Sequence, residues 1–71
     1  MLLHVPRRPS WRCDTCTYDW PCAVRRTELR LEGRTAAIML MGTYLTDALV
    51  ERELPHLAPD VLYRRFVGWA R

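Results

Sequence analysis

The chain has 71 residues, of which 49% are hydrophobic and 27% are charged, so it can form at most one small domain and is not extensively disordered. Its net charge is only +3, although all eleven basic residues are arginine, and this charge is too small to indicate nucleic-acid binding by itself. A domain of this size buries only about 60% of its unfolded surface and often needs a metal ion, disulfides or a partner.

Residues 1–20 are expected to form an irregular arm, followed by a three-helix region over residues 21–71 within the single domain 1–71. Pro6 and Pro9 favour extended backbone at the residues before them, so no helix should run through the arm. No later segment alternates as a strand does, and the only sheet we expect is a possible short hairpin around Cys13 and Cys16. The predicted fold class is therefore all-α, with a small zinc-knuckle arm followed by three short helices.

The first helix is predicted from Trp20 or Pro21 to Leu31, with Asp19 as N-cap and Gly33 as the stop. This places Cys22 in the first helical turn, where free backbone amides favour a thiolate.

The second helix is predicted from Ala36 to about Glu53, with Thr35 as its cap. Glycine in a helix interior costs about 1 kcal/mol relative to alanine. We interpret the presence of Gly42 as a sign that another helix, from this chain or a second copy, approaches closely there. The third helix should start at Pro59 and run nearly to the C-terminus, with Arg64 and Arg65 pointing away from the core.

Three cysteines and one histidine within nineteen residues predict a metal site. A Cys-x2-Cys pair projects two sulfurs from one tight turn, and five further residues bring a third sulfur alongside. Zinc accepts three cysteines and one histidine in a tetrahedron, and a closed site of this kind is structural. The predicted ligands are His4, Cys13, Cys16 and Cys22.

Two alternatives remain open for these residues. His56, between the second and third helices, is a rival fourth ligand. The cysteines can also be three reduced, buried apolar residues without a metal, and His4 a loose terminal residue.

The aromatic and basic residues near the cysteines also have two interpretations each. Trp11 and Trp20 either form an exposed recognition surface or pack over the metal site, and we favour packing. The nearby arginines can form a basic face for nucleic acid or a solvated surface balanced by acidic residues, and the small net charge favours the second. These arginines are Arg7, Arg8, Arg12, Arg25, Arg26 and Arg30.

The motifs His4, Arg8-Pro9-Ser10-Trp11, Cys13-x2-Cys16 and Trp20-Pro21-Cys22 resemble a group of short actinobacterial proteins, often labelled flavin reductase or hypothetical protein. The resemblance covers nearly the whole chain and implies a Cys/His metal site at the same four residues. The family pattern often has glycine after the second cysteine, where this chain has Thr17. A looser resemblance, in Cys-x2-Cys-x5-Cys alone, is to WhiB-like iron–sulfur regulators, whose fourth cysteine and Gly/Trp-rich turn are absent here.

The sequence therefore favours a small protein that binds structural Zn²⁺ and acts as an accessory or protein-interaction module, with a protein partner or a second copy of the chain. The alternatives are a nucleic-acid-binding regulator with an Arg-rich face, an iron–sulfur or redox sensor, and a flavin-linked reductase component. We expect no enzyme, because we find no Gly-rich phosphate loop and no cysteine free of the proposed site. An odd number of cysteines and the lack of a signal-peptide pattern predict a cytoplasmic protein. The longest uncharged run after the cysteines, residues 35–46, is too short to span a membrane.

Overall fold

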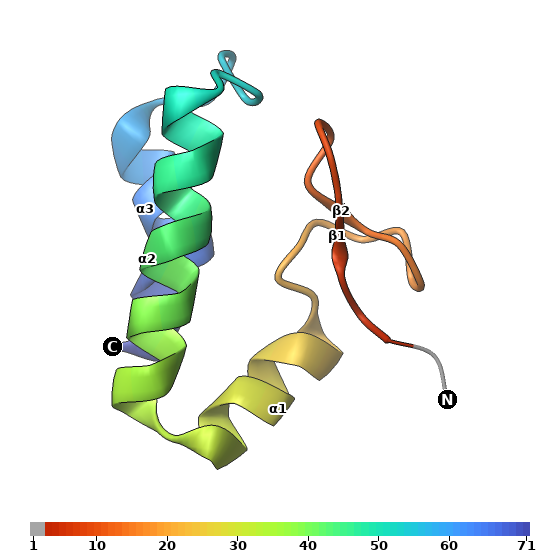
Figure 1. Ribbon diagram of the computed structural model, residues 1–71, viewed down its shortest axis with the longest axis vertical. Helices are drawn as coiled ribbons and strands as arrows, with labels where there is room; N and C mark the ends of the chain where they lie inside the picture. The colour runs from red at the N-terminus through yellow and green to blue at the C-terminus, as the bar shows by residue number, and fades with distance from the viewer. Residues whose placement is uncertain (1–2) are drawn as a thin grey trace.

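The computed structural model describes residues 3–71, which form a small antiparallel sheet followed by three α-helices and one 3₁₀ turn (Figure 1). In the sheet, Pro6 pairs with Cys13 and Arg7 with Arg12. The protein is mostly helical as predicted, but the arm is a hairpin rather than irregular chain, so all-α describes it only in part. The elements are β1 (Pro6–Arg7), β2 (Arg12–Cys13), α1 (Ala23–Glu32), α2 (Arg34–Val50), α3 (Pro59–Phe66) and η1 (Gly68–Ala70).

The first helix begins later than predicted, at Ala23, with Cys22 as its N-cap residue in an extended conformation. Asp19 is not the cap. It forms an isolated antiparallel bridge with Arg12 and so belongs to the arm. Pairing with the hairpin therefore overrides the local capping signal and keeps Trp20 and Pro21 out of the helix.

Gly33 ends the first helix, as predicted, and also precedes the first residue of α2, so Thr35 is not a cap. Its φ of +127° is a conformation that residues with a side chain rarely adopt. One glycine thus allows the sharp change of direction between α1 and α2 seen in Figure 1.

The second helix ends at Val50 rather than Glu53, and α3 starts at Pro59 as predicted. The expected close approach of another helix to Gly42 is wrong within the described chain, because no atom of another element lies within 4 Å of a Cβ built there. The third helix ends at Phe66, and the tail continues as the turn η1, which packs on α2 and α3.

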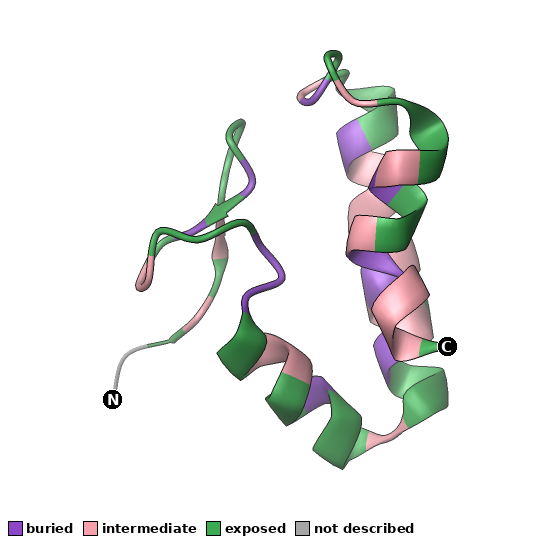
Figure 2. Ribbon diagram, turned by 180° about the vertical axis from the view of Figure 1, so that it is seen from behind, coloured by how far each residue is buried: buried purple, intermediate pink, exposed green. Residues whose placement is uncertain are grey.

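The core joins the arm to the helices through four aromatic side chains. Trp11 and Trp20 are 0% and 1% exposed, so they are not a surface for recognition. Trp11 packs edge-on against Tyr44 of α2 and Phe66 of α3, with ring centroids 5.8 and 5.2 Å apart, and Trp20 lies 4.7 Å from Tyr44. Figure 2 shows the buried stretch that precedes α1, whereas α1 itself is largely exposed.

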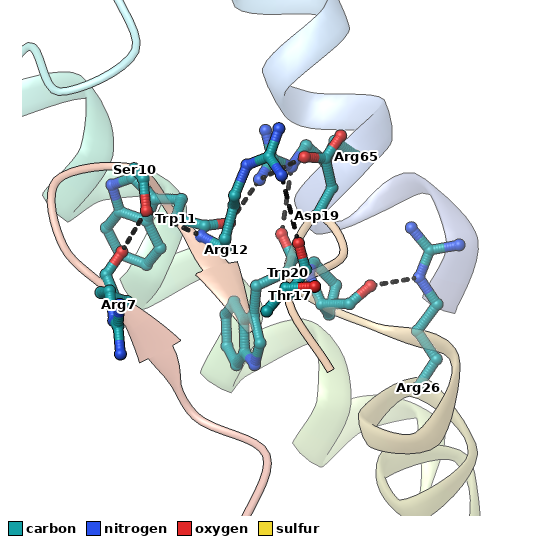
Figure 3. Close-up of polar contacts among 10 residues, drawn as sticks. Arg7, Ser10, Trp11, Arg12, Thr17, Asp19, Trp20, Arg26 and Arg65 are labelled. Carbon is teal, nitrogen blue, oxygen red and sulfur yellow. Dashed lines mark hydrogen bonds and ion pairs between the residues drawn. The ribbon is translucent and has the colours of Figure 1, made fainter. Parts of the chain in front are cut away.

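Two charged residues, one just past α2 and one on α3, bind the arm to these two helices. Glu53, just past α2, accepts a hydrogen bond from the Trp11 indole at 3.2 Å and pairs with Arg8. Arg65 of α3 donates to the carbonyl oxygens of Trp11 and Trp20 (Figure 3). The expectation that Arg65 points away from the core is therefore wrong, because the arm covers that side of α3.

Candidate metal centre

The four predicted ligands come together at one point between the arm and α1. Their ligand atoms all lie within 4.8 Å of one another, and the cluster consists of His4, Cys13, Cys16 and Cys22. The Nδ1 atom of His4 lies 3.2 Å from the sulfur of Cys13 and 3.3 Å from that of Cys22. All three cysteines are free, and two of them, Cys13 and Cys22, are buried.

The Cys-x2-Cys turn has the local structure of a metal knuckle. The backbone amide of Thr17 donates to the carbonyl of Cys13, which closes the turn, and the amide of Cys13 donates to the carbonyl of Tyr18. Thr17 has a φ of +63°, in the left-handed region that favours glycine. This explains physically why glycine suits the position after the second cysteine, and it shows that Thr17 adopts the required turn at a cost in strain.

The third cysteine is positioned by the start of α1. Cys22 is the N-cap residue, and its carbonyl accepts the first helical bond, from the amide of Arg26 at 2.9 Å. The side chain of Arg26 also holds the preceding carbonyl of Pro21 at 3.0 Å. Cys22 is therefore fixed to a helix end but lies one position before the helix, whereas the sequence predicted it inside the first turn.

The histidine of the cluster is His4 and not His56. The hairpin returns His4 to the knuckle, since the amide of Asp14 donates to the carbonyl of Val5 and the Thr15 hydroxyl donates to that of Leu3. His56 is exposed in the loop between α2 and α3 and is not part of the cluster.

Two of the thiols have opposite pKa shifts. Burial raises the pKa of Cys13, but hydrogen bonds from the amides of Cys16 and Thr15, with the Cys16 side chain, outweigh it and lower that pKa to about 6. Burial raises the pKa of Cys22, opposed by the amide of Arg25, and the neighbouring thiols of Cys13 and Cys16 raise it further. Three thiolates this close repel one another, so a cation is needed to hold all of them in the charged form.

The donor set fits a single tetrahedral ion. With Zn–S bonds of about 2.3 Å and Zn–N bonds of about 2.0 Å, the ligand atoms of a tetrahedral site lie about 3.5 to 3.8 Å apart. The observed separations, from 3.2 Å to at most 4.8 Å, bracket these values. Side-chain shifts of less than about 1 Å would make the cluster regular, so it is suited to metal binding.

Sequence reasoning predicted the four residues that the structure brings together, but it missed the two residues that secure the arm on which three of them stand. Glu53 lies just past the end of α2, and Arg65 follows another arginine in an amphipathic helix, so neither carries a local signal of its partner. The one indirect signal is the predicted burial of Trp11 and Trp20. A buried residue needs hydrogen-bond partners for its backbone as well as for its side chain.

Comparison with protein-family models, curated protein sequences and solved structures finds no match to this chain. The resemblance to short actinobacterial proteins therefore stays a prediction. Among residues 3–71, no helix combines the length and the apolar character needed to cross a bilayer.

Proposed function

We propose that the protein is a small binding module whose N-terminal arm is held in place by structural Zn²⁺. The observation that supports this most strongly is the convergence of one imidazole and three thiols on one point from three chain segments. His4, Cys13, Cys16 and Cys22 would hold the ion. The zinc would cross-link the hairpin to the start of α1 and would supply no catalytic step, because a site closed by four protein ligands has no open position.

The close spacing of the ligands favours one ion over an iron–sulfur cluster. A four-iron cluster binds each ligand to a different iron and so needs its ligands spread around a larger body than a single ion. Here one imidazole nitrogen lies within 3.3 Å of two sulfurs. The mixed set of three thiolates and one imidazole is also typical of structural zinc.

A role in interaction is the part of the proposal that concerns the helices. Several large apolar side chains on α1 and α2 are exposed, among them Leu31 (86%), Met39 (69%) and Val50 (71%). Exposed apolar groups of this kind are available to a partner protein or to a second copy of the chain. A flavin-linked or other enzymatic role has no comparable support, because all three cysteines serve as ligands.

The test is the metal content of protein purified without oxygen. Elemental analysis should give one zinc per chain and no iron, and replacement by Co²⁺ should give the intense visible bands of tetrahedral cobalt with thiolate ligands. Cys16→Ser should abolish stoichiometric binding and His4→Ala should weaken it, while His56→Ala is the matched control and should bind normally. Folded protein with no bound metal, or with iron and sulfide, would refute the proposal.

A further inference from the structure

An open groove of about 690 Å³ lies between the arm and α1, next to the metal centre, and Cys22 is the one lining residue that it shares with the centre. Its arm side includes Arg12, Tyr18 and Asp19, and its helix side includes Arg26 and Arg30. Its volume is within the range of about 300 to 1,000 Å³ typical of ligand sites.

The three arginines of the groove differ from most of the chain's other arginines in having no acidic partner. Arg7, Arg8 and Arg25 each form an ion pair with a carboxylate. Among residues 3–71, no ion pair includes Arg12, Arg26 or Arg30. The structure therefore divides the candidate basic face into arginines with an acidic partner and arginines without one, a division that the sequence pattern does not indicate.

The guanidinium groups of the groove are oriented rather than loose. Arg12 donates to the carbonyl of Thr17 at 3.3 Å, and Arg26 donates to that of Pro21 at 3.0 Å (Figure 3). Arg26 and Arg30 both lie over the Trp69 ring, 5.7 and 5.4 Å from its centroid. Each group keeps further N–H donors for a ligand, since a guanidinium has five.

The electrostatics of the groove are positive. Burial lowers the pKa of Arg65, Asp19 opposes this shift, and the charges of Arg26 and Arg12 lower it further. Asp19 is the groove's one acidic lining residue, and its carboxylate lies 3.9 Å from Arg65. Oriented and unpaired guanidinium groups match the geometry of phosphate oxygens.

An exposed aromatic ring at the same groove favours nucleic acid over other anions as its ligand. Tyr18 is 76% exposed, although its backbone is fixed by the hydrogen bond from the amide of Cys13 to its carbonyl. A ring that is held at the backbone and free on its faces can stack on an unpaired base. An acidic peptide would use the arginines but would gain little from the ring.

From this juxtaposition we propose that the groove binds single-stranded nucleic acid, with Arg12, Arg26 and Arg30 on the phosphates and Tyr18 stacked on a base. The proposal goes beyond the zinc module proposed above. It rests on that module in one respect, namely that the ion holds the arm side of the groove against the helix side.

The test is fluorescence anisotropy with zinc-loaded protein and a labelled oligothymidylate of about eight nucleotides. Three phosphate contacts predict a slope of about −2 in a plot of log K against log salt concentration. Arg12→Gln should weaken binding roughly three- to tenfold and reduce the slope by about 0.7. Tyr18→Ala should weaken binding about fivefold or more without changing the slope.

Arg34→Gln is the matched control, because it removes the same charge at an exposed residue outside the groove and should leave affinity nearly unchanged. Tyr18 and Arg12 are both exposed, so these variants should keep their zinc and their near-ultraviolet circular dichroism. Arg30→Gln gives a second measurement from the helix side of the groove.

Three results would overturn the proposal. They are no saturable binding below about 1 mM protein at low salt, equal losses in Arg34→Gln and Arg12→Gln, and binding of poly-glutamate as tight as that of the oligonucleotide with no effect of Tyr18→Ala. Zinc content is measured on the same samples. Zinc-loaded protein that fails to bind contradicts the groove alone, whereas zinc-free folded protein that binds contradicts the zinc centre and leaves the groove supported.

Discussion

Removal of the metal should unfold the arm, and the size of the effect follows from the structure. Ordering the 19 residues from His4 to Cys22 costs about 28 kcal/mol, at about 1.5 kcal/mol per residue. Burial of the Trp11 and Trp20 indoles returns about 10 kcal/mol, at about 200 Å² each and about 25 cal/mol per Å². The backbone and Arg65 hydrogen bonds of the arm contribute about 7 kcal/mol more.

The remaining deficit of about 11 kcal/mol lies within the range of about 10–16 kcal/mol that structural zinc contributes in small peptides. The arm should therefore be folded with zinc and unfolded without it. Because Trp11 and Trp20 leave the core together, apo protein should show red-shifted tryptophan emission and should lose its near-ultraviolet circular dichroism.

The assay is chelator titration of a Trp69→Phe variant, in which the two indoles of the arm are the only tryptophans and are excited selectively over the three tyrosines. A reductant keeps the thiols free, elemental analysis confirms that the metal has gone, and added zinc should restore the signal. Blue-shifted emission that persists in metal-free protein would refute the reasoning, since it would mean that the aromatic cluster orders the arm without the ion.

Three substitutions test the polar and backbone features of the arm by urea denaturation of zinc-loaded protein. Arg65→Met should lower the free energy of unfolding by about 3 kcal/mol, since two carbonyls lose a charged donor, and an unchanged midpoint would show that these bonds contribute nothing. Glu53→Ala should lower it by about 1–3 kcal/mol, because the buried Trp11 indole N–H loses its acceptor; a loss as large in a Glu51→Ala control would contradict this assignment. Thr17→Gly should raise stability by about 1 kcal/mol, because glycine adopts the left-handed conformation without strain, and a lower midpoint would be inconsistent with strain at this residue.

The cluster of one histidine and three cysteines could be predicted from sequence because the information that defines it is local. The spacing of Cys13 and Cys16 defines one turn, and Cys22 follows at a distance that a short loop can span. His4 carries less local signal than the cysteines, because its position depends on a hairpin whose two-residue strands have no alternating pattern. The choice between His4 and His56 therefore required the structure.

The helix boundaries and the role of Arg65 depend on contacts distant in sequence. Asp19 and Pro21 resemble helix-start residues, but the bridge between Asp19 and Arg12 draws them into the arm. The apolar pattern of α3 indicates which face meets α2, but it cannot indicate that the arm covers the side that carries Arg65 and presents the carbonyls of Trp11 and Trp20 to it. The carbonyls of Trp11 and Trp20 are buried with their indoles, and buried carbonyls need hydrogen-bond donors, which Arg65 supplies.

The metal centre and the groove share one structural element, the segment that joins the knuckle to α1. Arg12 and Tyr18 belong to the arm, while Arg26 and Arg30 belong to α1, and Cys22 belongs to both the centre and the groove lining. A ligand that bridges the two sides stabilises the same arrangement that the ion stabilises. Coupling of this kind is reciprocal: zinc and the oligonucleotide raise each other's affinity by the same factor at equilibrium. If the rate of zinc association is unchanged, a bound oligonucleotide should slow the loss of zinc to a chelator by that factor. If neither ligand changes the affinity of the other, the groove keeps its shape without the ion.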